Sequence, residues 1–413
     1  MIFKKLVIAS IIHYNYPFKL NSSLNVMKFS HIADCHLGSW RQPELRMLNF
    51  KSFAESLEKS ISEKVDFVLI TGDLFDSAYP QIEILEETFF QLKKLKDSGI
   101  PCFYIAGSHD YSASGKTFLS VLEKAGFCKN ISQPEERGEQ IILNPVVFKN
   151  IALYGYPGKK SGVEVNEIKK IKLQDSPGLF KILALHTSIK NAIGNLPIDS
   201  VDESKLPQAD YYALGHLHIE YDTGNFVYAG PTFPNNFQEL EELKQGSFYI
   251  VETNPFNARK IKLGSPEIEV IDIEISNALT ATDKIMRELE KRTLENKIVL
   301  LKLSGKLEQG KTSNIDFRKI EELVREKKAY SFLKNISKLI TEEPEFKFEH
   351  RDMENLEAEV IKKYLAENES AFNSLVNPLL NSLSLEKHEG ETATTFALRL
   401  FGEFKKAADI ELK

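Results

Sequence analysis

A recurring pattern of short apolar runs, each followed at once by polar residues, constrains the fold of this chain more than any other feature. The runs are KFSHIADCH, VDFVLITGD, PCFYIAGSHD, IALYGYPG, KILALHTSI and DYYALGHLH, and they lie between residues 28 and 218. They alternate with stretches of helical character, which predicts a sheet that is buried on both faces. In such sheets ligands bind beyond the strand ends. The sequence therefore predicts an α/β fold whose binding site lies in the loops after the strands.

Two helices are predicted between the first three runs. In residues 43–64, four apolar residues from Phe50 to Ile61 recur at spacings of four, three and four, which is one helical face. Residues 82–97 are predicted as a second helix, because Ser98-Gly99-Ile100-Pro101 ends the helical pattern.

The chain changes character near residue 267. EIEVIDIEI and KIVLLKLSG are predicted strands, and residues 278–295 and 315–328 are predicted helices, so residues 267–340 form a small α/β domain. Residues 341–413 are acidic and are predicted as a helical tail, which either folds back on the body or binds a partner. Its apolar stripes are Leu356, Val360, Tyr364 and Leu365, followed by Phe396, Leu400, Phe401 and Phe404.

Composition excludes several classes of protein. The 413 residues are 42% hydrophobic and 27% charged, which is ordinary for a globular chain and not for a disordered or collagen-like one. The net charge of -6 excludes a uniformly basic surface but leaves a local basic stripe open. Cys35, Cys102 and Cys128 have no CxxC spacing, which fits a reducing compartment without structural disulfides. No window approaches the roughly 18–20 apolar residues of a membrane span.

The first 26 residues are expected to precede the natural start, which we place at Met27 directly before the first strand. MIFKKLVIASII imitates a signal peptide, and this is the alternative interpretation. His13 and Asn15 interrupt the apolar run, however, and no Ala-x-Ala-like cleavage site follows. Residues 1–26 are therefore predicted to be an N-terminal extension.

Aspartates and histidines gather at the strand ends. The clusters are Asp34-x-His36, Gly72-Asp73-Leu74-Phe75-Asp76, Gly107-Ser108-His109-Asp110, His186 and Gly215-His216-Leu217-His218. Carboxylate oxygens and imidazole nitrogens suit manganese, iron or zinc. Asp73 can bridge two ions, and two ions roughly 3.5–4 Å apart clamp a phosphate and activate a water. Any one cluster alone is more often structural, but all of them together, in this order, predict a shared metal site.

The order of these clusters resembles D-x-H, GD, G-N-H-D, H and G-H-x-H, the pattern of the calcineurin-like metallophosphoesterases. HIADCHLGSWRQ, VDFVLITGDLFD, YYALGHLH and YAGPTFPNNFQELEELKQGSFYIVE are similar to the nuclease subunit of the double-strand-break repair complex, the SbcD and meiotic recombination eleven family. The resemblance covers residues 27–265 well, the next domain by architecture and the tail by its helical character. It implies a four-layer α/β/β/α sandwich at 27–266, a capping domain at 267–340 and a tail at 341–413 that binds a partner ATPase.

The resemblance also implies the roles of single residues. The first ion is held by Asp34, His36, Asp73 and His218, and the second by Asp73, His186, His216 and the residue in the Asn position of G-N-H-D. His109 would act on the phosphate, and Asp110 would orient His109 through a hydrogen bond.

One position departs from the family pattern, because Ser108 stands in place of the asparagine. A hydroxyl is shorter than an amide and is the weaker ligand. The second ion is then expected to bind less tightly, or a water to complete its shell. An inactive scaffold is the alternative.

The function implied is a metal-dependent DNA exonuclease, with endonuclease activity left open, that uses two divalent ions, most simply Mn²⁺. The family acts as a homodimer, for which residues 43–64 and 82–97 are the candidate contacts unless their apolar faces only pack on the sheet. The tail would bind an SMC-like coiled-coil ATPase of the SbcC type, which places the protein in the cytoplasm at the nucleoid. The alternatives are a phosphatase or small-molecule phosphodiesterase of the same superfamily, and a non-catalytic DNA-end scaffold.

Other residues near these motifs receive simpler interpretations. His31 lies on the first strand and is predicted to be structural, and Cys35 is predicted to pack on the face opposite the ligands. Asp76 is close enough to the metal loop to influence substrate choice. His13, His350 and His388 are expected at the surface.

Overall fold

The structure is a computed structural model that describes residues 26–112, 115–160, 162–194, 197–341 and 393–407, together with isolated positions between 365 and 385. The chain divides into two compact units, residues 1–342 and 343–413. No helix in the described part of the chain is long and apolar enough to cross a membrane.

The first sheet is built around three parallel strands that the sequence predicts. Its order is β15 (Phe256–Lys262), β14 (Ser247–Thr253), β1 (Lys28–Ile32), β2 (Phe67–Thr71), β3 (Cys102–Ile105) and β4 (Lys129–Asn130). β1, β2 and β3 pair in parallel, whereas β14 and β15 add an antiparallel edge. β2 and β3 are buried along their whole length, which explains their continuous apolar sequences.

The second sheet contains the other three predicted strands. Its order is β12 (Tyr221–Thr223), β13 (Phe226–Tyr228), β11 (Tyr211–Gly215), β10 (Phe180–His186), β8 (Ile151–Tyr156) and β7 (Val146–Phe148). β8, β10, β11 and β13 run parallel, and the edge strands β7 and β12 are antiparallel to their neighbours.

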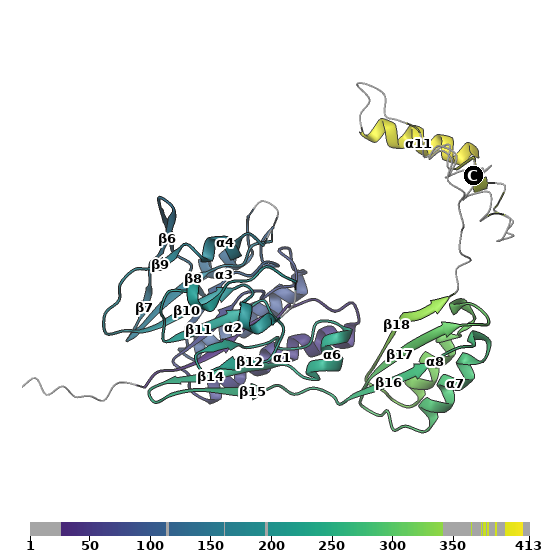
Figure 1. The fold of residues 1–413 in the computed structure, drawn as a ribbon, viewed down its shortest axis with the longest axis horizontal. Coiled ribbons are helices and arrows are strands. Elements are labelled where there is room, and N and C mark those ends of the chain that lie inside the picture. The colour runs from purple at the N-terminus through teal and green to yellow at the C-terminus, as the bar shows by residue number, and fades with distance from the viewer. Residues whose placement is uncertain are drawn as a thin grey trace, which may run out of the picture. The chain divides into compact units, whose positions relative to one another are not determined.

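The two sheets face each other and helices cover their outer faces (Figure 1). Phe29 and Phe67 of the first sheet share a buried core with Leu153, Ile182 and Tyr211 of the second. The outer face of the first sheet packs on α1 (Pro43–Ser62), α2 (Ile82–Asp97) and α3 (Leu119–Lys124). The outer face of the second packs on α4 (Glu164–Ile168), α5 (Lys190–Ile193) and a small sheet of β5 (Pro134–Arg137), β6 (Gln140–Leu143) and β9 (Ile171–Leu173). The predicted four-layer α/β/β/α class is confirmed.

Helix α1 buries a different stripe from the predicted one. Of the four apolar residues predicted to share its inner face, only Leu57 is fully buried. Ser52, Ser56 and Ser60 are buried instead, and the hydroxyl of Ser60 lies 2.7 Å from that of Ser30 on β1. These small side chains let the helix approach the sheet closely. A prediction based on apolar residues alone does not place serines on the inner face of a helix.

A second α/β element follows the sandwich and is called the cap below. It comprises β16 (Ile268–Glu274), α7 (Ala278–Glu290), β17 (Ile298–Leu307), the short 3₁₀ helix η2 (Thr312–Asn314), α8 (Phe317–Glu326) and β18 (Ser331–Thr341). The strands form a parallel sheet in the order β16-β17-β18, and the two α-helices share a core with it. β18 was not predicted from the sequence. The domain boundary at residue 266 stays a prediction, since residues 1–342 form one compact unit.

Helix α6 (Phe237–Leu243) lies between the sandwich and the cap. Its Leu240 is fully buried in a core that also contains Leu45 of α1 and Ile298 and Leu300 of β17. On the same helix, Glu241 accepts a 2.7 Å hydrogen bond from the ammonium group of Lys302 on β17. The cap is therefore attached to the sandwich partly through α6. A further 3₁₀ helix, η1 (Glu203–Lys205), lies in the loop before β11.

The second unit contains helix α11 (Ala393–Ala407), which coincides with the second apolar stripe predicted in the tail. Leu398 and Phe401 on this helix are exposed, at 67% and 60% of their surface. The first predicted stripe, apart from Leu365, lies outside the described residues, as do His13, His350 and His388.

His31 joins the two sheets and is structural, as predicted. It is fully buried, with Nδ1 2.9 Å from the hydroxyl of Tyr211 on β11 and Nε2 3.0 Å from the hydroxyl of Thr71 on β2. Burial lowers the pKa of His31 to about 3, so the ring is neutral in the folded protein at physiological pH. Cys35 is also buried and unpaired, in agreement with a packing role.

Acidification is expected to destabilise the fold through His31. Below pH 6.5 the histidine of the unfolded chain binds a proton, whereas the buried ring of the folded protein stays neutral down to about pH 3. The free energy of unfolding therefore falls as the pH is lowered. The loss is about 1.4 kcal/mol per pH unit in this window. Urea unfolding of the metal-free protein at pH 7 and pH 5 should show a smaller loss in His31→Gln than in the wild type. Equal losses in the two proteins would contradict the assignment.

Candidate metal centre

The carboxyl ends of strands from both sheets bring the predicted residues to one place. Asp34 and His36 follow β1, Asp73 follows β2, His109 follows β3, His186 ends β10, and His216 and His218 follow β11. The loops after β1 and β2 continue side by side, because the amides of Asp34 and His36 donate to the carbonyl oxygens of Gly72 and Asp73 at 3.1 and 2.9 Å. The site is therefore a product of the packing of the two sheets.

Four of these residues have a left-handed backbone that glycine normally occupies. The φ angles of Asp34, His36, Asp73 and His216 are 49°, 42°, 50° and 96°. This conformation is unfavourable by about 1–2 kcal/mol for a residue with a side chain. Non-glycine residues in this region cluster at functional sites, where the surrounding structure holds them in place.

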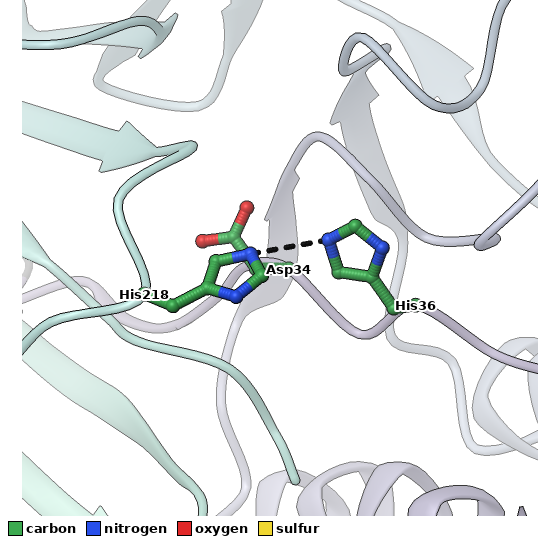
Figure 2. A group of neighbouring side chains, drawn as sticks. All are labelled: Asp34, His36 and His218. Atoms are coloured by element: carbon green, nitrogen blue, oxygen red, sulfur yellow. Dashed lines mark hydrogen bonds between the residues drawn. The ribbon is translucent and has the colours of Figure 1, made fainter. Parts of the chain in front are cut away.

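A first group of ligand atoms comes from Asp34, His36 and His218 (Figure 2). The Nε2 atoms of His36 and His218 face each other at 3.1 Å, and Nε2 of His36 lies 3.5 Å from Oδ2 of Asp73. Asp34 is fully buried, and in the part of the chain that the structure describes its Oδ2 has no hydrogen-bond partner.

A second group comes from Asp34, Asp73 and His186. Nδ1 of His186 lies 2.9 Å from the carbonyl oxygen of Thr71, which accepts its proton. Nε2 lies 3.1 Å from Oδ2 of Asp73, but their orientation does not make a hydrogen bond, and among the described residues this buried nitrogen has no other partner. Asp73 contacts both groups and is thus placed to bridge two ions.

The pKa shifts of the clustered residues indicate that positive charge stabilises the buried carboxylates. Burial alone would lower the pKa of His186, but the carboxylates of Asp73 and Asp34 outweigh it and raise that pKa to about 10. Burial tends to raise the pKa of Asp73, yet the neighbouring His186 and His36 hold it below its usual range. Burial raises the pKa of Asp34. Without a cation, a proton on His186 compensates the buried carboxylates, and a divalent ion would replace that proton.

These residues fit a divalent cation. Oδ2 of Asp34 and Nε2 of His186 have no hydrogen-bond partner among the residues that the structure describes, and buried polar atoms of this kind are rare and call for an explanation. Oxygen and imidazole donors together suit manganese, iron or zinc. The ring of His216 lies 5.2 Å from that of His186, and burial together with the charge on His186 lowers the pKa of His216 to about 4. His216 is therefore neutral at pH 7, as a ligand must be.

His109 stands at the edge of the cluster with half of its side chain exposed. Its amide donates to Oδ1 of Asp73 at 2.8 Å, and its Nδ1 lies 3.0 Å from the carbonyl oxygen of Asp76. That contact fixes Nδ1 as a donor and leaves Nε2 for a substrate. Ser108 and His109 line one cavity together with Tyr111 and Lys160. The ligand role of Ser108 stays a prediction.

The structure corrects the role expected for Asp110. Its oxygens do not bond the ring of His109 but accept from the amides of Phe75 at 3.1 Å and Gly107 at 2.9 Å. Burial and the charge of Asp73 raise the pKa of Asp110 to about 7. Asp110 therefore ties the loop after β3 to the loop after β2. The prediction failed because sequence adjacency does not determine which backbone donors a buried carboxylate meets.

Two carboxylates contact His36 and His218 on the Nδ1 side of their rings. Oδ1 of Asp76 lies 3.2 Å from Nδ1 of His36, and Oε1 of Glu239 lies 2.9 Å from Nδ1 of His218. Asp76 was predicted to influence substrate choice, whereas Glu239 was not predicted to belong to the site. The only signal for Glu239 was its place in FQELEE, inside the segment that resembles the repair nucleases.

Comparison with known proteins agrees with this geometry. The profile of the family described as Calcineurin-like phosphoesterase matches residues 27–220. The chain is similar to the DNA double-strand break repair protein Mre11 of Archaeoglobus fulgidus, with 25% identity over 88% of this chain and 87% of the relative. The Mre11 of Methanocaldococcus jannaschii is 27% identical over 71% of this chain and 77% of its own. That of Methanococcus maripaludis is 30% identical over 65% of this chain and 73% of its own.

The absence of a side chain at Gly107 is expected to be necessary for cation binding. A Cβ there would overlap Oδ1 of Asp73 and lie 2.6 Å from the carboxyl carbon. Gly107→Ala should therefore displace Asp73 and weaken Mn²⁺ binding at least about tenfold in isothermal titration calorimetry. Gly264→Ala is the matched control, because its Cβ would meet only the flexible carboxylate of Glu55 at 3.3 Å. Wild-type affinity in Gly107→Ala would show that Asp73 is not a ligand.

Proposed function

This chain belongs to the Mre11 family of calcineurin-like phosphoesterases, and on that premise we propose that it is a metal-dependent nuclease that processes DNA ends in double-strand-break repair. The reaction is the hydrolysis of phosphodiester bonds. The observation that carries the proposal is the buried cluster of Asp34, Asp73 and His186 beside the facing rings of His36 and His218. Its ligand atoms suit cations that bind phosphate.

We propose two divalent ions, with Mn²⁺ as the expected metal. Asp34, His36, Asp73 and His218 would hold the first, and Asp73, His186, His216 and Ser108 or a water would hold the second. When bound, such ions clamp the phosphate and supply a water that is nucleophilic at neutral pH. The buried atoms of Asp34 and His186 that have no hydrogen-bond partner in the described part of the chain support this assignment.

His109 is the proposed catalytic residue of the protein itself. With Nδ1 held by the carbonyl oxygen of Asp76, a protonated ring presents its Nε2 proton to the oxygen that leaves phosphorus. The amide of His109 also donates to Oδ1 of Asp73, which keeps the backbone of His109 at a fixed distance from that carboxylate. Asp110 stabilises this arrangement by accepting hydrogen bonds from the amides of Gly107 and Phe75.

The apolar residues left exposed on α1 and α2 support a homodimer. Leu57 of α1 and Leu92 of α2 pack on the sheet, as the simpler interpretation of these helices requires. Met47 on α1 and Ile82 and Phe90 on α2 are nevertheless 61–70% exposed. A second copy of the chain would bury them.

A metal-dependent cleavage assay tests the function. Purified protein with Mn²⁺ should cleave duplex ends or single-stranded DNA and should lose this activity in chelator. His109→Asn should lower turnover roughly 10²–10⁴-fold, the range for loss of a general acid. Its Mn²⁺ affinity in calorimetry should stay unchanged, because the imidazole of His109 is not assigned as a ligand.

The same assay separates the rival functions. Hydrolysis of p-nitrophenyl phosphate esters without cleavage of plasmid, single-stranded or duplex-end DNA would indicate a phosphatase or small-molecule phosphodiesterase. DNA binding without cleavage at saturating Mn²⁺ would indicate a scaffold. Recovery of cleavage in Ser108→Asn would then trace the inactivity to that position.

The tail is proposed to bind an SMC-like coiled-coil ATPase, which would place the protein in the cytoplasm at the nucleoid. Leu398 and Phe401 on α11 are exposed apolar residues that such a partner would cover. The full chain should co-elute with the purified ATPase, and Leu398→Glu with Phe401→Glu should prevent co-elution without a change in DNA cleavage by the isolated nuclease. Deletion of residues after 345 should have the same effect on co-elution. Undiminished association of both variants would refute the proposed contact.

A further inference from the structure

We propose that Asp76 and Glu239 are positioning residues that orient His36 and His218 toward one cation and so determine its affinity. This inference rests on the proposed metal-dependent function. It assigns a role to Glu239, which lies 21 residues beyond His218 on a different element, and a new role to Asp76.

Both rings are bound in the same way. Each Nδ1 lies next to a carboxylate oxygen, at 3.2 Å for His36 and Asp76 and at 2.9 Å for His218 and Glu239. An ionised carboxylate only accepts hydrogen bonds, so each Nδ1 must carry a proton. In a neutral imidazole the other nitrogen, Nε2, is then a bare acceptor.

This tautomer leaves both Nε2 atoms available to one cation. The two Nε2 atoms face each other at 3.1 Å (Figure 2). Two acceptors at this distance do not satisfy each other unless one ring takes a second proton. A cation would accept a lone pair from each, and Asp34 belongs to the same group of potential ligand atoms. A carboxylate behind a ligand histidine also increases the basicity of the nitrogen that binds the metal.

The two carboxylates differ in how firmly they are held. Glu239 is mostly buried, and its Oε2 accepts from the amide of Asn235 at 2.8 Å. Its own amide donates to the side chain of Asn236, the N-cap of α6. Asp76 is 40% exposed, and its contact with His36 is longer. Glu239 is therefore expected to contribute more to cation affinity than Asp76.

Calorimetry with Mn²⁺ on the full-length, metal-free protein tests the proposal. Glu239→Gln keeps an acceptor for the amide of Asn235 but removes the charge behind His218, and Asp76→Asn makes the equivalent change behind His36. Each should weaken one Mn²⁺ binding event, by roughly tenfold to a hundredfold in Glu239→Gln and by less in Asp76→Asn. His218→Ala should remove the same event.

Glu241→Gln is the matched control, because it makes the same chemical change on α6 in a carboxylate that bonds Lys302 instead of a histidine. It should keep wild-type affinity. The visible absorption of bound Co²⁺ should change in Glu239→Gln and not in Glu241→Gln, since only the former changes a carboxylate that contacts the ring of His218. Circular dichroism verifies that both variants are folded.

Wild-type Mn²⁺ affinity in both Glu239→Gln and Glu239→Ala would overturn the proposal, as would equal weakening in Glu241→Gln. Cleavage by Glu239→Gln should recover at saturating Mn²⁺, because every ligand remains. A wild-type protein that cleaves no DNA would refute the nuclease function and leave the binding comparison valid. The two proposals therefore fail separately.

Discussion

Two buried carboxylates, Asp34 and Asp73, create the constraint around which the rest of the structure is arranged. Both belong to groups of ligand atoms that lie within 4.8 Å of one another, and both are almost completely shielded from water. Negative charge in such a place is strongly unfavourable unless positive charge stands beside it. The histidines of two sheets, the left-handed backbone at four ligand positions and the close approach of Gly107 all bring compensating groups to these two side chains. The chemistry proposed for the protein follows from supplying that charge as metal ions.

The parts that the sequence could predict share a physical cause. β2 and residues 182–185 of β10 are continuous apolar runs, because strands covered on both faces have no reason to alternate. The proposed ligands Asp73 and His186 come directly after or at the end of those runs, where a strand leaves the sheet. Helix α2 was predicted at its observed bounds, since Gly99 and Pro101 end the helical pattern sharply. Local sequence determines each of these features.

The parts that the sequence could not predict depend on contacts between distant segments. Glu239 reaches His218 only because α6 packs between the sandwich and the cap, and no spacing rule joins the two residues. Asp110 meets backbone amides of two loops instead of its neighbour His109, a choice made by tertiary packing. On α1, Ser56 is buried because the sheet lies very close, and polarity alone indicates the opposite. In each case tertiary packing decided the outcome.

Helix α6 has a consequence for communication within the protein. One of its faces carries Glu239 against His218, and the adjoining positions Leu240 and Glu241 contact β17 of the cap. If a molecule bound to the cap shifted β17, the packing of Leu240 on β17 would pass that shift to His218, a proposed metal ligand, through one seven-residue helix. Thermodynamic linkage makes this relation reciprocal. The factor by which a cap ligand changes the affinity for the cation is also the factor by which the cation changes the affinity for that ligand.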